Sequence, residues 1–183
     1  TNGAALNGQS TAVLSAGSAE AAQGSTIVVP VTVKVPAGAL LGAGTVELRY
    51  DPAVVIVTSC ASDPAGAFDT AYCNRDYDRD FRGTDAVRFS FASPRGAGGD
   101  VILANVTFKV IAPVETATNL DVVPVVFVDP TGSPLGVSPQ AGKITTTAPA
   151  KVDPSTPPAD TRERNLSALW HYLTAVAGKL VSF

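Results

Sequence analysis

Short apolar runs, each broken by Gly, Pro, Asn or Asp, dominate residues 11–147. In residues 25–35 apolar side chains recur at every second position, with Val28, Thr32 and Lys34 on the opposite face. A strand with one buried face requires this period of two. Pro30 interrupts the pattern and favours an edge strand or a bulge there. By this criterion the candidate strands are residues 11–16, 25–35, 44–50, 54–60, 86–92, 100–111, 120–128 and 142–147.

The breaks between these runs have the residues that turns require. Residues 51–52 read Asp-Pro, residues 94–96 read Pro-Arg-Gly, and residues 129–132 read Asp-Pro-Thr-Gly. Proline presets φ in such turns, and glycine accepts positive φ. Eight or nine short strands with these turns predict an all-β antiparallel sandwich over residues 11–147. Residues 1–10 form a small, polar N-terminal extension, and no helix is predicted before residue 160.

The chain changes character after the predicted sandwich. Residues 148–160 contain four prolines and read as a stiff, Pro-rich linker. In residues 161–183 apolar side chains recur at steps of three and four, which predicts an amphipathic helical tail beginning near Asp160 or Thr161. Fourteen uncharged residues separate Arg164 from Lys179, and a membrane span needs roughly 20.

The apolar stripe of the predicted tail has three interpretations. It packs on the sandwich of its own chain, it docks on another subunit, or it lies on a membrane surface. The single Lys179 is a poor match to a basic membrane anchor, so the first two interpretations stay open. The residues expected to contact a partner or another copy are Leu166, Leu169, Trp170, Leu173, Val176 and Leu180. Such contacts between copies would give a homo-oligomer or polymer.

Composition and charge narrow the class of protein. Hydrophobic residues make up 45% of the chain and charged residues 16%, which indicates a folded protein. The net charge of −3 and the absence of a basic stripe argue against a nucleic-acid partner. The chain has no methionine, even at position 1, so we expect a mature chain secreted after cleavage of a leader.

Cys60 and Cys73 are the two cysteines of the chain. In a secreted protein they favour a disulfide that closes a local loop, and two buried free thiols are the alternative. Zinc needs four ligands, and the one histidine, His171, lies far away in the sequence. That lone histidine also leaves no nucleophile paired with a base, so we do not expect an enzyme.

Side-chain oxygens alternate through residues 74–80, as in the first half of a calcium-binding loop. The acidic members are Asp76, Asp78 and Asp80. Counting from Asp76, Phe81 stands where the loop requires Gly and Val87 stands where it requires Glu. We therefore favour a solvated loop with surface ion pairs, keep calcium as the alternative, and predict no other cofactor.

Several stretches in order resemble the cohesin domain family. Residues 24–31 are similar to its opening turn and Val-Pro-Val strand, and residues 47–55 to its strand ending in Tyr-Asp-Pro. Residues 101–110 resemble its alternating strand that ends in Thr-Phe-Lys-Val. Residues 127–132 and 142–144 resemble its last turns and closing strand.

The resemblance implies a nine-stranded antiparallel jelly-roll sandwich whose face binds proteins, without catalysis. In cellulosomal relatives that face holds a dockerin, which carries its own calcium, but related modules also occur in surface proteins without a cellulosome. The insert between the cysteines and the helical tail are foreign to the family. We therefore expect an extracellular interaction and assembly module of a cell-surface or filamentous complex, binding other protein modules or copies of itself. The alternatives are a dockerin-binding cohesin and a carbohydrate-binding surface module, although only 7% of residues are aromatic.

Overall fold

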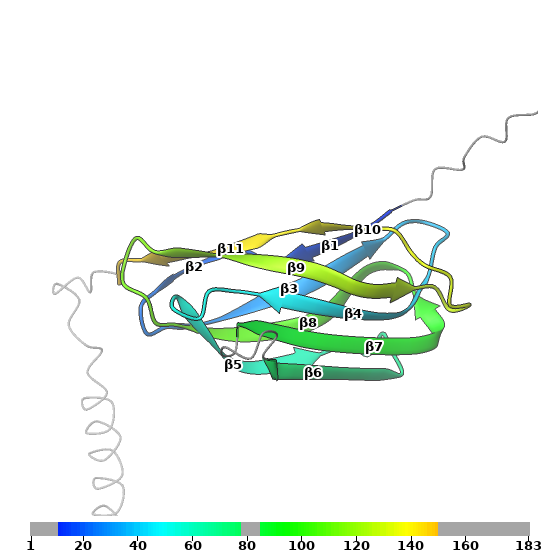
Figure 1. Ribbon diagram of the computed structural model, residues 1–183, viewed down its shortest axis with the longest axis horizontal. Coiled ribbons are helices and arrows are strands. Elements are labelled where there is room, and N and C mark those ends of the chain that lie inside the picture. Colours follow the sequence, from blue (N-terminus) through cyan, green and yellow to red (C-terminus); the bar gives the residue numbers. More distant parts are fainter. Residues whose placement is uncertain (1–10, 78–84, 150–183) are drawn as a thin grey trace, which may run out of the picture. The chain divides into compact units, whose positions relative to one another are not determined.

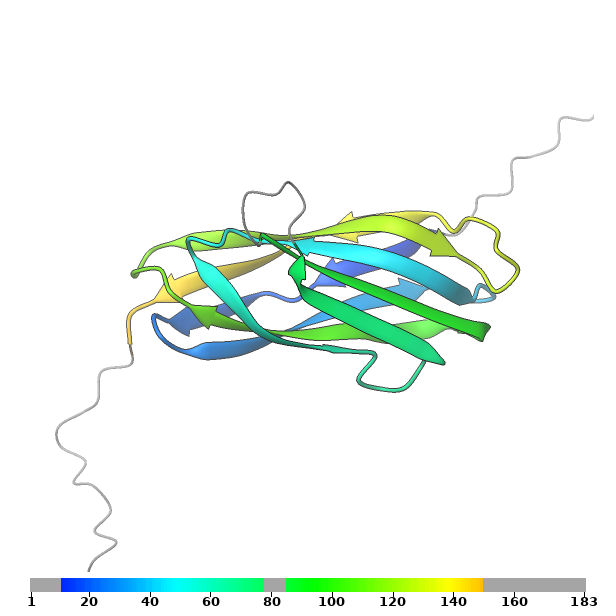
Figure 2. The same ribbon diagram turned by 60° about the horizontal axis from the view of Figure 1, so that its bottom comes forward.

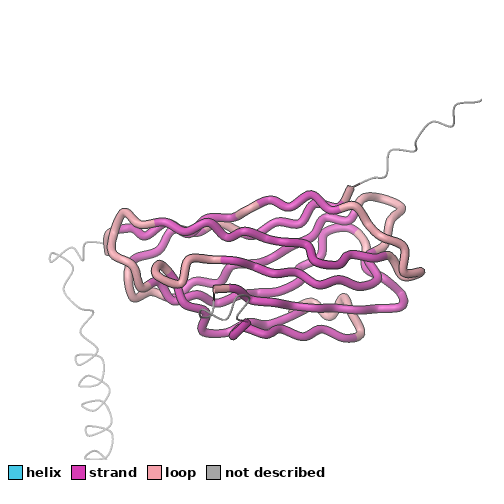
Figure 3. Tube along the Cα trace, in the orientation of Figure 1, coloured by secondary structure: helices cyan, strands magenta, loops and turns pink. Residues whose placement is uncertain are grey.

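The computed structural model of the chain describes residues 11–77 and 85–149, and Figure 1 shows them as two layers of strands. Within these residues there are eleven strands and no helix. They are β1 (Ala12–Ala16), β2 (Ala19–Ala22), β3 (Thr26–Val35), β4 (Leu41–Arg49), β5 (Val55–Ser62), β6 (Thr70–Tyr77), β7 (Ala86–Ala97), β8 (Gly99–Val110), β9 (Ala117–Val128), β10 (Val137–Gln140) and β11 (Gly142–Thr147). Strands account for most of the described chain, and loops join them at the ends of the layers (Figure 3). The all-β sandwich is confirmed.

The strands form two sheets. The five-stranded sheet has the order β10-β1-β3-β8-β5, and the six-stranded sheet has the order β2-β11-β9-β4-β7-β6. Most neighbouring strands are antiparallel, but β1 with β10 and β2 with β11 are parallel pairs. Both views place β5 and β6 at the same side of the sandwich (Figure 1 and Figure 2). The sandwich is therefore antiparallel except where these two short pairs close its other side.

The core lies between the sheets and is built by the alternation seen in the sequence. On β3 the side chains of Val29, Val31, Val33 and Val35 are buried, while Val28 is exposed. Aromatic rings add to the core, because Phe91 packs 4.5 Å from Phe68 and 5.9 Å from Phe127 between ring centroids. Each fully buried side chain of this size contributes roughly 1.5–3 kcal/mol through removal of apolar surface from water.

The strand count differs from the nine that the family resemblance implies. Two extra strands arise because the chain crosses between sheets in mid-run. β1 lies in the five-stranded sheet and β2 in the six-stranded sheet, and β10 and β11 divide in the same way. β2, β6 and β10 were not among the candidate strands, because residues 19–22, 70–77 and 137–140 carry few apolar side chains in alternation.

The interruption at Pro30 coincides with one of these crossings. β3 lies between β1 and β8, so it is not an edge strand. The register shifts between Val31 and Thr32, one residue after the proline, and the extra residue is Leu103 of the neighbouring strand β8. The carbonyl oxygen of Pro30 accepts a hydrogen bond from the N–H of Gly17 at 2.9 Å, at the point where the chain leaves β1 for β2. β3 as a whole is therefore not an edge strand, but Pro30 lies just beyond the pairing of β3 with β1, which begins at Val31, and next to a register shift in the pairing of β3 with β8.

The N-terminal extension 1–10, the linker beyond Pro149 and the predicted helix over residues 161–183 lie outside the described residues. In the part of the chain that the structure describes, no helix is long and apolar enough to cross a membrane.

Candidate functional site

The outer face of the six-stranded sheet presents its side chains in four ranks across β9, β4, β7 and β6. Strand register places one residue of each strand in each rank. The first rank is Val128, Ala43, Ala92 and Thr70, and the second is Val126, Thr45, Ser90 and Tyr72. The third is Val123, Glu47, Arg88 and Asn74, and the fourth is Asp121, Arg49, Ala86 and Tyr77. Residues between the ranks, such as Val46 and Phe89, are buried, so the ranks face away from the core.

The first two ranks contain no charged residue, and we name them the uncharged half of the face. Tyr72 is 67% exposed and Val126 is 48% exposed, so both present apolar surface to a partner. Between them the hydroxyl groups of Thr45 and Ser90 lie 2.9 Å apart and share a hydrogen bond. The uncharged half thus exposes apolar and aromatic groups without a charged residue among them, and the centre of a protein-binding patch is likewise depleted of charge and enriched in aromatic residues.

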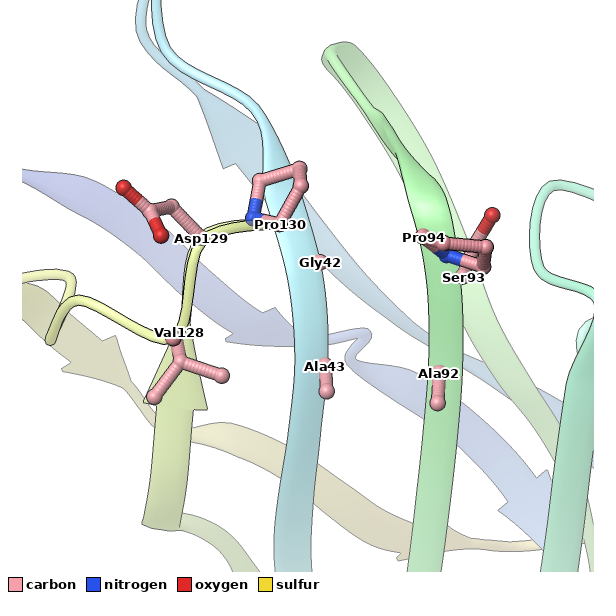
Figure 4. A pocket seen from close by; sticks show the side chains of 9 residues that line it. Gly42, Ala43, Ala92, Ser93, Pro94, Val128, Asp129 and Pro130 are labelled. Carbon is pink, nitrogen blue, oxygen red and sulfur yellow. The ribbon is translucent and has the colours of Figure 1, made fainter.

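A shallow depression of about 270 Å³ lies at the end of the uncharged half (Figure 4). Its lining residues are Gly42, Ala43, Ala92, Ser93, Pro94, Val128, Asp129, Pro130 and Gly132. Figure 4 shows Gly42 and Ala43 on β4 between the Asp129–Pro130 turn and the Ser93–Pro94 segment. A Cβ atom on Gly42 would lie 2.5 Å from the backbone of Asp129, so the turn packs here only against glycine.

The turn after β9 is fixed by one carboxylate. Asp129 Oδ1 accepts hydrogen bonds from the Thr131 N–H, the Thr131 hydroxyl and the Ser133 N–H at 2.8, 2.7 and 2.9 Å. The Thr131 hydroxyl, followed by the Ser133 N–H, lowers the pKa of the Asp129 carboxyl. The wall of the depression therefore holds its shape before any partner arrives.

The third and fourth ranks form the charged half of the face. The Glu47 side chain is only 8% exposed, and its carboxylate accepts a hydrogen bond from Arg49 Nη2 at 2.8 Å. Arg88 lies over the Tyr77 ring, 5.2 Å from the centroid, and donates to the Tyr77 hydroxyl at 3.0 Å. The charges of this half are largely engaged with their neighbours, which lowers the cost of covering them with a partner.

A second depression, of about 360 Å³, lies beside the charged half and is polar. Its lining residues are Arg49, Tyr50, Asp51, Asp85, Thr118, Asn119 and Asp121. Burial, and next the carboxylate of Asp85, raises the pKa of Tyr50 to about 12, so the phenol stays protonated at neutral pH. Across the described ranges, no three His, Cys, Asp or Glu side chains are grouped so that they could hold a metal ion.

The edge of the face at β6 is tied to its surroundings at two points. Cys60 of β5 and Cys73 of β6 form a disulfide, with 6.2 Å between their Cα atoms. Just before β6, Asp69 accepts hydrogen bonds from the Ser93 hydroxyl at 2.6 Å and from Arg95 Nη2 at 2.7 Å. The predicted disulfide is confirmed.

The outer face of the five-stranded sheet has a different character. Its exposed large apolar side chains, Val28, Ile56 and Ile102, fall on three different ranks of β3, β8 and β5. Lys109 lies opposite Ile56, and the pair Lys34 and Asp100 adds further charge. Scattered apolar residues of this kind are normal for a surface that binds nothing. The six-stranded sheet therefore carries the better candidate site.

Other residues singled out in the sequence are placed differently or lie outside the described residues. Asp76 belongs to strand β6 and is paired with Arg75 at 3.3 Å, whereas Asp78 and Asp80 are not described. The calcium alternative therefore stays a prediction. The tail residues Leu166, Leu169, Trp170, Leu173, Val176 and Leu180 also lie outside the described residues, as does His171.

Sequence reasoning did not find Tyr72, Thr45, Ser90 or Val126. The signal that could have found them is the outward set of each alternating strand. These residues form one patch only because distant strands pair in a particular register. Thr45 and Ser90, for example, lie 45 positions apart in the sequence. A single sequence does not reveal which residues pair.

Comparison with known proteins supports this description. The family model described as "Cohesin domain" matches residues 12–146. No curated protein matches the chain. The chain is similar to the cohesin CaCohA2 of Clostridium acetobutylicum, solved in complex with a dockerin variant, with 22% identity and a TM-score of 0.64 over 75% of this chain and 100% of that one.

Two further solved structures are similar to the chain. One is a non-cellulosomal cohesin from the archaeon Archaeoglobus fulgidus, with 23% identity and a TM-score of 0.62 over 76% of this chain and 93% of that one. The other is the third cohesin of ScaC from Acetivibrio cellulolyticus, in complex with the ScaB dockerin, with 24% identity and a TM-score of 0.62 over 75% of this chain and 100% of that one. At these identities the likeness shows the fold.

Proposed function

The chain belongs to the cohesin domain family, and from that premise we propose that its sandwich binds a dockerin module of another protein through the outer face of its six-stranded sheet. Cohesin domains are non-catalytic binding modules, so the chain is not an enzyme. The similar structures from Clostridium acetobutylicum and Acetivibrio cellulolyticus are cohesins in complex with dockerins. Those complexes support a dockerin as the partner here.

The observation that carries the proposal is the division of this face into an uncharged and a charged half. Interfaces bury an apolar centre enriched in aromatic residues and surround it with polar groups. Tyr72 and Val126 supply exposed apolar surface in one rank, with the Thr45 and Ser90 hydroxyls between them. The charged half, with Arg49 and its neighbours, presents charges of both signs that set the orientation of the partner.

The first test is a pair of substitutions in the second rank. Binding hot spots are enriched in Tyr and cost at least about 2 kcal/mol on truncation, and with Tyr72 as such a hot spot Tyr72→Ala should weaken dockerin binding about 30-fold. Val126→Lys places an unpaired charge in the uncharged half and should weaken binding further. The dissociation constants are measured by titration calorimetry with a panel of purified, calcium-loaded dockerin modules.

The control for these variants is Val28→Ala, because Val28 is 59% exposed and lies on the outer face of the other sheet. This variant should bind with the affinity of the wild-type chain. Failure of every dockerin to bind the wild-type chain would contradict the partner. Weaker binding by Val28→Ala together with normal binding by Tyr72→Ala would move the site to the other face.

We further propose that the protein works outside the cell, as a module of a cell-surface assembly. The Cys60–Cys73 disulfide supports this location, because disulfides persist in oxidising compartments.

A separate proposal concerns the C-terminal residues 161–183, whose apolar residues recur at helical spacing. We propose that this segment joins copies of the chain or attaches it to other surface proteins. The mass of the particle in solution, with and without the segment, tests it.

A further inference from the structure

The Cys60–Cys73 disulfide joins the two sheets where both of them end. β5 is the last strand of the five-stranded sheet and pairs with β8, and β6 is the last strand of the six-stranded sheet and pairs with β7. The bond therefore connects two edge strands that share no backbone ladder among the described residues. Since β6 is also the outermost strand of the candidate binding face, the bond lies at the border of the site.

Beyond its ladder with β7, the edge strand β6 is held by a hydrogen bond from Arg75 Nη1 to the Thr58 carbonyl oxygen of β5 at 2.6 Å and by the contact of Tyr77 with Arg88, but it buries little apolar surface. Only the small side chains of Ala71 and Cys73 pack from β6 against the core, each in part. Its neighbour β7 buries the large rings of Phe89 and Phe91 instead. The ladder between β6 and β7 also shifts register between Asn74 and Tyr77. A strand that buries so little apolar surface opens locally more easily than its neighbours, unless a covalent bond restrains it.

The loop before β6 is held independently of the disulfide. The two carboxylate oxygens of Asp63 accept hydrogen bonds from the Ala67 and Phe68 N–H groups, both at 2.8 Å. The Phe68 ring is buried against Phe91. Loss of the disulfide would therefore leave this loop and the core in place, and its effect would be confined to β6.

Tyr72 connects this edge to the binding face. Because successive side chains of a strand point to opposite faces, Cys73 points inward opposite Phe89 while Tyr72 points outward opposite Ser90. We propose that the Cys60–Cys73 disulfide is a positioning device for the binding site, which holds β6 so that Tyr72 lies in rank with Ser90 and Thr45. This inference rests on the proposed function, because it assigns Tyr72 to that same partner contact.

The first measurement needs no partner. Hydrogen exchange is compared between the full-length oxidised chain and the full-length Cys60→Ser/Cys73→Ser variant. Amides of residues 70–74 should exchange at least about tenfold faster in the variant, while those of β4 and β9 keep their protection. Unchanged exchange in β6 would overturn the inference. Equally faster amide exchange across both sheets would also overturn the inference, because the disulfide would then stabilise the whole fold and not β6 in particular.

The second measurement is a double-mutant cycle with the dockerin that binds the wild-type chain. Tyr72→Ala should weaken binding at least about tenfold in the oxidised chain and less than about threefold in the Cys60→Ser/Cys73→Ser background. Equal losses in the two backgrounds would overturn the inference. Val126→Ala on β9 is the matched control and should cost the same factor in both backgrounds. If no dockerin binds the wild-type chain, the proposed function fails, while the exchange measurement still decides the role of the bond in β6.

Discussion

At the scale of single residues, the carboxylate of Asp69 is held through both of its oxygens. The buried Ser93 hydroxyl donates to one oxygen at 2.6 Å and Arg95 donates to the other at 2.7 Å. The Ser93 hydrogen bond, followed by that of Arg95, lowers the pKa of Asp69 below its ordinary value of 3.8. A carboxyl whose pKa is lower in the folded state stabilises the fold above its ordinary pKa, and this stabilisation is lost as the pH falls through the lowered value.

We therefore expect Ser93→Ala to raise the pKa of Asp69 toward 3.8, because it removes the largest of the interactions that lower it. Carboxyl carbon shifts in an NMR titration measure the change. The pKa of Asp129, which is held low by its own turn, should stay where it is and serves as the internal control. In a matched series of urea unfolding curves, Asp69→Asn should lose less stability than the wild-type chain on acidification below about pH 4. Parallel pH profiles would contradict this role of Asp69.

At the scale of elements, two segments of the chain pass from one sheet to the other, and their packing against each other depends on one glycine. β1 passes into β2 through Gly17 and Ser18, and β10 passes into β11 through Ala141, directly before Gly142, the first residue of β11. A Cβ atom on Gly142 would lie 2.1 Å from the carbonyl oxygen of Gly17 and 2.8 Å from that of Ala16. The Lys143 N–H donates to the Ser18 hydroxyl at 3.0 Å across the same crossing. The backbones approach so closely that only glycine fits at position 142.

Gly142→Ala should therefore destabilise the sandwich by about 1–3 kcal/mol, the usual cost of forcing extra atoms into a packed site. Gly136→Ala is the control, since a Cβ atom there would meet nothing closer than 3.6 Å, and it should change the stability by less than about 0.5 kcal/mol. Urea denaturation of the two variants and the wild-type chain gives both values. Equal stabilities would show that the crossing relaxes at no cost.

Element by element, the sequence predicted the strands whose inward side chains are large and apolar. β3, β7 and β8 could be predicted because buried residues such as Val31, Phe89 and Phe108 alternate with polar residues along these strands. β6 was missed because its inward residues are only Ala71 and Cys73, which produce no apolar period. The binding face was missed for a related reason. Its residues are the outward members of four strands, and they become a site only through the pairing of strands distant in sequence.

At the scale of the whole molecule, every rank of the binding face and every strand of the core lies before Pro149. The compact unit that holds them ends at Pro149, and the remaining residues, from Ala150, do not belong to it. All four strands of the face, β9, β4, β7 and β6, belong to this compact unit. The two proposals, dockerin binding by the six-stranded sheet and association of copies through residues 161–183, therefore concern different parts of the chain, and truncation can test them separately.

A chain that ends at Pro149 should fold by itself, because it keeps the complete core and both sheets. Its free energy of unfolding should match that of the full-length chain within about 0.5 kcal/mol, and its dissociation constant for dockerin should be unchanged. Light scattering should give the monomer mass for the truncated chain and a larger mass for the full-length chain, because the apolar stripe that the sequence predicts over residues 161–183 would drive association. Monomers in both cases would contradict the proposal that residues 161–183 join copies. Loss of folding or of dockerin binding on truncation would contradict the assignment of the core and the site to the compact unit that ends at Pro149.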